Sequence, residues 1–181
     1  MHRSTADLEA GLDHIRSSPI DDGTLELVLR RPAVDEREVL ELAELSIDEG
    51  VVGDTWNVRG SKRTTDGSAH PDMALNVMNA RAIELIAGPR ERWPLAGDQL
   101  YVDLDLSAAN LDPWTKLAIG TAIIEITDQP HLGCAKFTQR FGLDAHRFVN
   151  SEVGRALNLR GVNARVAQPG TVRPGDVITR C

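Results

Sequence analysis

The chain is poor in cysteine and in aromatic residues. It has two cysteines, one tyrosine, three phenylalanines and three tryptophans among 181 residues, and one of the cysteines is the last residue. Two cysteines so placed cannot form a disulfide framework, which indicates a reducing, cytoplasmic setting. The scarcity of aromatics predicts a core that is mainly aliphatic.

The sequence also lacks long apolar runs and an excess of basic residues. No run approaches the roughly 20 apolar residues that span a bilayer, and the first residues do not resemble a signal peptide, so we expect no membrane association. Lysine and arginine number 20 against 27 acidic residues, for a net charge of −7. This balance argues against nucleic-acid binding. It leaves open a local basic site for a small anion.

The first half of the chain combines a helix, strands and one long loop. Residues 1–20 are interpreted as an N-terminal helical extension, and residues 24–181 as the main domain. Apolar and polar residues alternate over 24–30, which predicts a strand with one face exposed to solvent. Residues 37–45 fit either a helix or a strand, and their position between two turn signals favours a second strand. Residues 48–72 look like a loop, and loops of this length are usually functional or mobile.

The second half is denser in strand signals. Asn79 is expected to cap a helix that Gly88 stops. A helical stretch begins at Cys134, and Gly142 is expected to break it in two. The remaining apolar segments are short and read as strands over 74–78, 99–104, 115–119, 121–127, 161–167 and 176–179. The pattern predicts a β-rich α+β fold, a barrel with short peripheral helices.

Cys134 is the leading candidate for chemistry. It follows a turn punctuated by Pro130 and Gly133, and it begins a helix that carries Lys136 and Arg140. Helix N-terminal amides and a nearby cation favour the thiolate, which is the form that attacks sulfur or binds metal. The alternative is a buried cysteine that only packs.

A zinc site is a weaker interpretation of the same segment. His131 and Cys134 have the spacing of half a zinc site, and His70 is the only other central histidine. The other half of a zinc motif is missing. A three-ligand site would therefore rest on residue type alone, and loop or hydrogen-bonding roles for the histidines are the competing interpretation.

Two segments offer cations for an anion. Arg59, Lys62 and Arg63 surround a Gly-Ser pair, and such segments combine cationic side chains, hydroxyl donors and free backbone amides. A solvated basic loop is the alternative. Arg160 and Arg165 lie five residues apart near a predicted strand, so their side chains should lie on opposite faces and only one can point inward.

These segments together resemble the MOSC domain, the module at the C-terminus of molybdenum-cofactor sulfurases that also occurs in stand-alone bacterial proteins. The resemblance covers about residues 24–180. It rests on Gly50-x-x-Gly53-Asp54, Asn79-Ala80-Arg81, Ala96-Gly97-Asp98-Gln99-Leu100, the strand pair 117–127, Gly133-Cys134-x-Lys136-Phe137, Arg160-Gly161-Val162-x-Ala164-Arg165-Val166 and Val172-x-Pro174-Gly175-Asp176. The family's G-D-x-H feature stands here as Gly53-Asp54-Thr55-Trp56.

The resemblance implies two alternative functions centred on Cys134. In the first, Cys134 ligates molybdenum of a pterin cofactor (molybdopterin), and N-hydroxylated compounds are reduced there. In the second, Cys134 carries a persulfide supplied by a cysteine desulfurase that depends on pyridoxal phosphate. The cofactor-binding residues expected on this basis are Arg59, Lys62, Arg63, Asp54, Arg160 and Lys136. The sequence shows no pyridoxal-phosphate domain and no ferredoxin-type cysteine set, so a separate electron donor or desulfurase is expected.

Overall fold

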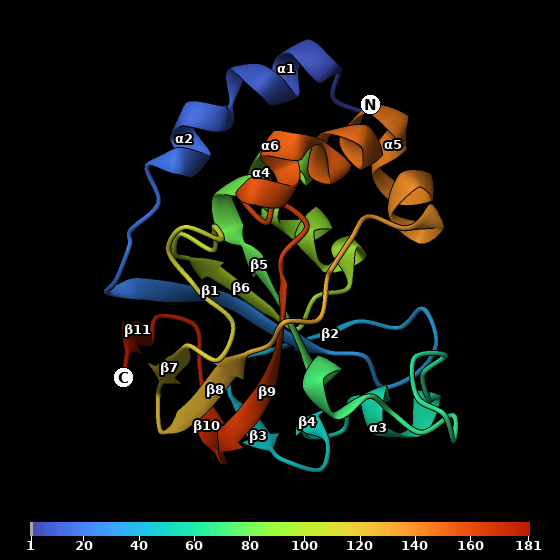
Figure 1. Ribbon diagram of the computed structural model, residues 1–181, viewed down its shortest axis with the longest axis vertical. Coiled ribbons are helices and arrows are strands. Elements are labelled where there is room, and N and C mark those ends of the chain that lie inside the picture. The colour runs from blue at the N-terminus through green and yellow to red at the C-terminus, as the bar shows by residue number, and fades with distance from the viewer. Residues whose placement is uncertain (1) are drawn as a thin grey trace.

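The computed structural model describes residues 2–181, and its centre is a closed seven-stranded barrel (Figure 1). The strand order is β11-β7-β8-β9-β5-β6-β1, and β11 pairs with β1 to close it. β5 and β6 are parallel, and the other neighbouring pairs are antiparallel. The barrel strands are β1 (Gly23–Arg30), β5 (Leu75–Asn79), β6 (Leu100–Asp103), β7 (Lys116–Ile119), β8 (Ala122–Ile126), β9 (Val162–Gln168) and β11 (Val177–Arg180). The predicted fold class is confirmed.

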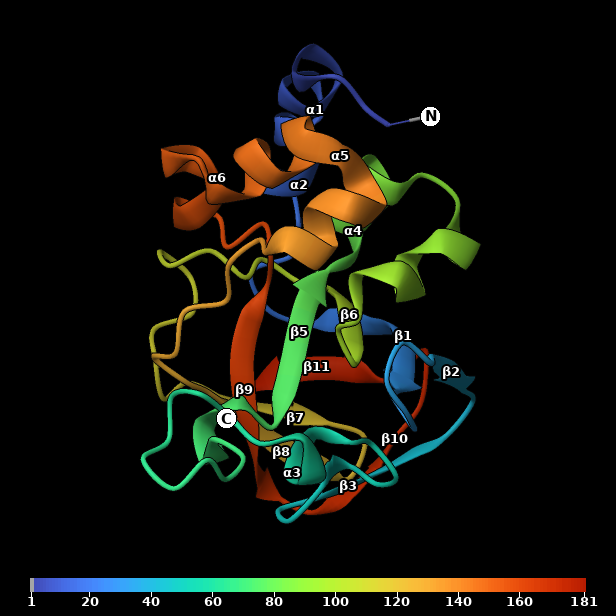
Figure 2. The same ribbon diagram turned by 90° about the vertical axis from the view of Figure 1, so that its right-hand side faces the viewer.

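Helices form a layer on one side of the barrel (Figures 1 and 2). This layer contains α1 (Thr5–Ala10), α2 (Leu12–Arg16), α4 (Ala80–Ala87), α5 (Ala135–Asn150) and α6 (Glu152–Ala156). The short 3₁₀ helix η2 (Arg90–Ala96) packs against α4 and α5. Leu8 and Ile15 are buried in the same apolar cluster as α4 and α5, so the N-terminal extension packs onto the domain.

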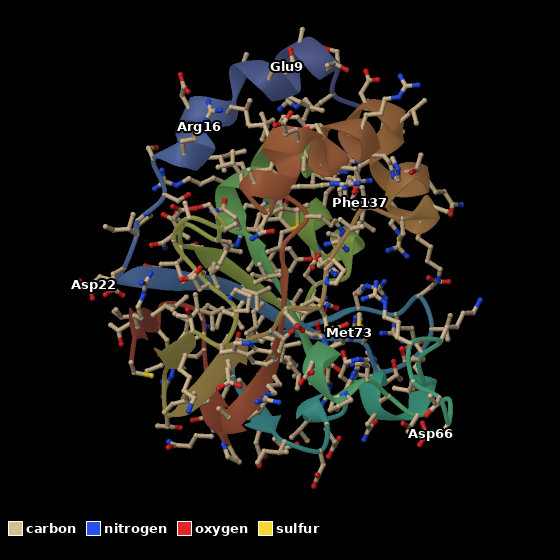
Figure 3. The ribbon with its side chains drawn as sticks, viewed as in Figure 1. Glu9, Arg16, Asp22, Asp66, Met73 and Phe137 are labelled. Atoms are coloured by element: carbon tan, nitrogen blue, oxygen red, sulfur yellow. The ribbon has the colours of Figure 1, made fainter. Side chains whose placement is uncertain are left out.

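Two apolar cores result, one on each face of the barrel wall. On β1, Leu25 and Val28 are buried in the barrel interior, whereas Leu27 and Leu29 belong to the cluster under the helices. A β-bulge between Leu25 and Leu27 accounts for the break in strict alternation. The interior is aliphatic, as the composition predicts. All three phenylalanines lie in the helical cluster, and Phe137 lies on the side of α5 that faces the strands (Figure 3).

The predicted single strand over 37–45 is wrong. The chain there forms β2 (Glu38–Leu40), which pairs with β1, and β3 (Ala43–Ser46), which lies in a second sheet of order β10-β3-β4. The other strands of this sheet are β4 (Gly50–Val51) and β10 (Gly170–Val172). The segment crosses from one sheet to another, and a sequence pattern does not reveal a change of partner.

The long loop over 48–72 is less structureless than expected. Besides β4 it contains α3 (Trp56–Arg59) and the 3₁₀ turn η1 (Pro71–Met73). Two predictions about helices are confirmed. The Asn79 side chain accepts a hydrogen bond from the Ala82 amide at the start of α4, and Gly142, with φ of 91°, interrupts α5. Within residues 2–181, every helix is too short or too polar to cross a membrane.

Candidate functional site

Cys134 stands at the start of α5 with its thiol exposed and outside any disulfide. Its backbone is extended (φ −118°, ψ 177°), and its carbonyl accepts hydrogen bonds from the amide and the hydroxyl of Thr138. The residue lines a cavity of about 260 Å³ between the helical layer and the barrel. The alternative of a buried cysteine that only packs is therefore wrong.

This cavity is lined by six cationic side chains and one carboxylate, that of Asp35. The cations come from segments far apart in the sequence: Arg31, Arg37, Arg59, Lys136, Arg140 and Arg160. Asp35 binds both Lys136 and Arg140 at 3.1 Å, so its charge is already compensated. An excess of positive charge in a concave site attracts anions. We refer to this site as the basic cavity.

Two buried aspartates hold the floor of the basic cavity in place. Asp54 binds the Arg31 guanidinium through both oxygens at 2.9 Å, and Asp98 binds Arg160 at 2.7 Å. Neither carboxylate is accessible to solvent. Burial by itself raises the pKa of Asp98, but the Arg160 charge and the His131 hydrogen bond outweigh it and lower that pKa to about 2. Asp98 is therefore ionised at neutral pH.

His131 lies beside this pair and also lines the cavity. Burial lowers its pKa below the usual histidine value, and the nearby Arg160 charge lowers it further, so the ring is neutral at pH 7. Because Nε2 lies 3.0 Å from the Asp98 carboxylate, Nε2 carries the proton and donates it. Nδ1 is then an acceptor, and the Asn76 amide nitrogen lies 3.5 Å from it.

Some cationic nitrogens of the basic cavity lack partners. The Nε atoms of Arg37 and Arg160 are buried without a hydrogen-bond acceptor among the described residues. Burial lowers the pKa of both Arg37 and Arg59, and neighbouring arginines add to the effect. Buried unpaired donors are costly, and these two nitrogens are unsatisfied among the described residues.

The structure brings together part of the predicted site. Cys134, Lys136, Arg59 and Arg160 all line the basic cavity. The prediction that only one of Arg160 and Arg165 points inward is confirmed, because Arg165 is half exposed and binds Glu125 and Asp72 on the surface.

The other predicted cofactor residues lie elsewhere. Asp54 lies behind the cavity, where it holds Arg31. Lys62 and Arg63 are outside the lining, and the Arg63 guanidinium lies 3.5 Å from Gln129. Asp66, further along the same loop, lies well away from Phe137 (Figure 3).

Sequence reasoning missed Arg31 and Arg37 and did not recognise Asp98 as a charge partner. Alternation along residues 24–30 could have been extended to Arg31, placing its side chain on the face opposite to that of the partly exposed Arg30. No local pattern marks Arg37. The zinc interpretation finds no support, because within residues 2–181 no three histidine, cysteine or acidic side chains gather as metal ligands. His70 instead accepts a hydrogen bond from the Asp72 amide.

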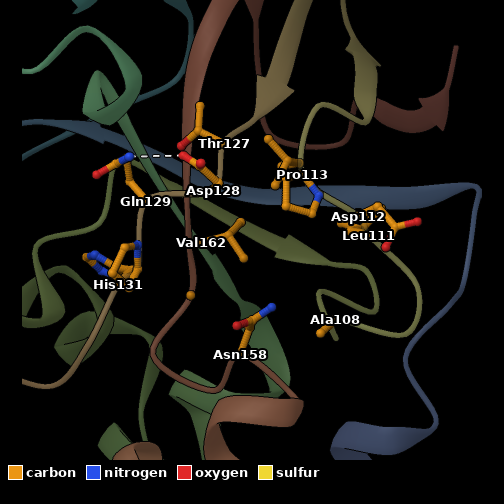
Figure 4. A pocket seen from close by; sticks show the side chains of 13 residues that line it. Ala108, Leu111, Asp112, Pro113, Thr127, Asp128, Gln129, His131, Asn158 and Val162 are labelled. Atoms are coloured by element: carbon orange, nitrogen blue, oxygen red, sulfur yellow. Dashed lines mark hydrogen bonds between the residues drawn. The ribbon is translucent and has the colours of Figure 1, made fainter.

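A second cavity, of about 290 Å³, also has His131 in its lining (Figure 4). Its lining includes the carboxylates of Asp112 and Asp128 and none of the lysines or arginines among the described residues. A hydrogen bond between Gln129 and Asp128 lies at its wall. The two cavities next to His131 thus differ in the sign of their charge.

The fold and the site define a class: a β-barrel protein with an exposed cysteine inside a basic cavity. The model of the MOSC domain family matches residues 95–179 of this chain, a segment that contains Cys134 and Arg160. No curated protein sequence matches the chain.

Three solved structures share the fold. YuaD from Bacillus subtilis has a TM-score of 0.59 at 15% identity, with 86% of this chain and 93% of that chain covered. YiiM from Escherichia coli has a TM-score of 0.56 at 19% identity, with coverage of 87% and 69%. A protein described as hypothetical has a TM-score of 0.58 at 20% identity, with coverage of 88% and 68%.

Proposed function

We propose that this protein binds the molybdenum cofactor, with Cys134 as the molybdenum ligand, and reduces N-hydroxylated compounds. The observation that carries the proposal is the position of an exposed thiol in the same cavity as six cationic side chains. MOSC domains are associated with this cofactor, and its pterin carries a phosphate.

The residues of the basic cavity fit such a group. Thiolate sulfur is a soft ligand suited to a transition metal, and guanidinium groups bind phosphate through paired hydrogen bonds. The unpaired Nε atoms of Arg37 and Arg160 supply donors that the protein leaves unused. Cys134 would hold the metal, and Arg37, Arg59 and Arg140 would bind the phosphate.

When bound, the molybdenum centre supplies the exchange of two electrons. Reduction of an N-hydroxyl group to the amine or amidine consumes two protons and two electrons and releases water. In this proposal the electrons come from a separate electron-donor protein, and the two cysteines of the described residues lie far apart in the sequence. The chain's own residues bind the cofactor, keep His131 neutral and hold its proton on Nε2 toward Asp98.

A sulfur-carrier function is the second candidate, and the exposure of Cys134 is the observation that favours it. The Cys134 thiolate would attack the terminal sulfur of a persulfide on a cysteine desulfurase. A new S–S bond forms on Cys134, the partner's S–S bond breaks, and the partner leaves as a thiolate. Pyridoxal phosphate would then act in the partner alone, and the cations of the basic cavity would stabilise the persulfide anion.

One paired experiment separates the two functions. Protein from a host that makes the cofactor is assayed for reduction of an aromatic amidoxime with a chemical electron donor, beside Cys134→Ala. Metal-free protein is incubated with a cysteine desulfurase and cysteine, and its intact mass is measured. The proposal predicts turnover that Cys134→Ala abolishes. A sulfur adduct on Cys134 without turnover would instead establish the carrier function.

A further inference from the structure

The loop that precedes Cys134 is hydrogen-bonded to Asn150, the last residue of α5. The Asn150 amide accepts a hydrogen bond from the Gly133 backbone N–H at 3.0 Å, and its nitrogen donates to the Gly133 carbonyl at 3.3 Å. Both backbone groups of the residue before the thiol are thus held by Asn150, which is 17 positions further along the chain. The contact is partly buried, where a hydrogen bond competes less with water.

A second set of contacts reaches the backbone carbonyl of Cys134 itself. The Asn150 nitrogen also lies 3.1 Å from His146 Nε2, and His146 Nδ1 lies 2.9 Å from the Thr138 hydroxyl. That hydroxyl in turn lies 3.2 Å from the Cys134 carbonyl. The chain of contacts from Gly133 through Asn150, His146 and Thr138 therefore returns to Cys134.

The hydrogen-bonding roles in this chain are mutually consistent. Asn150 must present its oxygen to the Gly133 N–H, so its nitrogen faces His146 as a donor. His146 Nε2 therefore accepts, and its proton is on Nδ1, where it is donated to Thr138. The Thr138 hydroxyl is then free to donate to the Cys134 carbonyl. Every donor finds an acceptor, which is the condition for a rigid polar network.

The break in α5 makes these contacts possible. In a straight helix, residues 138 and 146 would be about 12 Å apart along the axis, since each residue advances about 1.5 Å. Their side chains instead meet at 2.9 Å because Gly142 adopts φ of 91° and turns the second half of α5 back. Gly133 completes the fit: a Cβ there would lie 2.9 Å from the Asn150 nitrogen and from Val149.

From this network we infer that Asn150 is a positioning residue for Cys134, assisted by His146 and Thr138. It fixes the backbone on the N-terminal side of the thiol, while Thr138 fixes the carbonyl on the other side, so that the sulfur is presented to the basic cavity in one orientation. The inference rests on the proposed function only in taking Cys134 as the group that binds the metal. Asn150 itself lies outside the cavity lining.

The test compares Asn150→Ala, Asn150→Asp and a matched control, Asn110→Ala. Asn110 also donates to two backbone carbonyls, those of Ile20 and Asp105, but far from the thiol. Hydrogen exchange of the Gly133 amide and the alkylation rate of Cys134 are measured on metal-free protein. Molybdenum retained after gel filtration is measured on protein from a host that makes the cofactor. Thr138→Val serves as a second variant if Asn150→Ala does not fold.

Asn150→Ala is expected to speed exchange of the Gly133 amide about five- to tenfold, which corresponds to the loss of about one net hydrogen bond. Asn150→Asp keeps the acceptor and restores slow exchange. Molybdenum affinity should fall about tenfold in Asn150→Ala, as for other residues that orient a metal ligand, and stay unchanged in Asn110→Ala. Unchanged Gly133 exchange, or faster exchange with undiminished molybdenum, would overturn the inference.

The same design distinguishes failure of the inference from failure of the proposed function. If the wild-type protein holds no molybdenum, the proposed function fails. The positioning role is then decided on metal-free protein: it stands if Asn150→Ala changes both Gly133 exchange and the alkylation rate of Cys134 while Asn110→Ala changes neither. It falls if the two variants behave alike.

Discussion

Substituting Asp98 by asparagine should destabilise the protein by about 3–5 kcal/mol, the usual cost of removing one partner of a buried ion pair. The Asp98 carboxylate is fully buried and binds the Arg160 guanidinium at 2.7 Å and His131 at 3.0 Å. Asparagine keeps the shape and removes the charge. Arg160, whose side chain is 7% exposed and whose Nε already lacks a partner, would be left as an uncompensated buried cation.

The matched control is Asp103→Asn. Asp103 also binds an arginine, Arg81, through two hydrogen bonds of 2.7 and 3.1 Å, but both side chains are partly exposed. An exposed pair contributes about 1 kcal/mol or less. Free energies of unfolding are measured by urea denaturation at pH 7, and the double variant Asp98→Asn/Arg160→Met, which removes the stranded charge, should recover part of the loss. If Asp98→Asn costs no more than Asp103→Asn, the ion pair does not hold the cavity floor and the reasoning is refuted.

Three further outcomes are expected. Stability should fall as the pH drops below about 6.5, because burial holds the pKa of His131 below its value in the unfolded chain, which then binds a proton that the native protein excludes. In urea denaturation, the free energy of unfolding should therefore decrease less between pH 7 and pH 5 in His131→Gln than in the wild type. Gly161→Ala should lower the free energy of unfolding by several kcal/mol, since its Cβ would lie 2.3 Å from the Val77 carbonyl oxygen. Gly175→Ala, with a similar φ and open space around the Cβ, should lower it by about 1 kcal/mol. Equal losses of stability in urea denaturation would contradict this. Pyrophosphate should slow alkylation of Cys134, less so at high salt or in Arg37→Ala, because its binding depends on charge; protection independent of both would contradict a basic anion site.

Much of the fold followed from local patterns. Strand alternation over 24–30 and the short apolar runs of the second half predicted the barrel, and the cap at Asn79 and the break at Gly142 were predicted from single residues. The strands that were not predicted are short ones whose existence depends on the strand they pair with. The segment 37–45 changes sheets, and β10 occupies only Gly170–Val172 in a stretch that reads as a turn. Short pairings of this kind leave no periodicity to detect.

The site was predictable at its centre and not at its edges. Cys134 and Lys136 share one motif, so the sequence placed them together. The Arg31 and Arg37 contributions depend on the end of β1 and the start of β2 meeting α5, which is a consequence of tertiary packing. The sequence also predicts Asp54 to lie next to the cofactor. In the structure, its buried carboxylate instead forms an ion pair with Arg31, a contact that likewise depends on tertiary packing.

The central claim is that Cys134 binds molybdenum in the basic cavity. Its most direct test is elemental analysis of protein purified from a host that makes the molybdenum cofactor, with wild type and Cys134→Ala prepared side by side. The account predicts stoichiometric molybdenum in the wild type and little in the variant, with the fold of both intact by circular dichroism. Full molybdenum occupancy in Cys134→Ala, or none in the wild type, would contradict it.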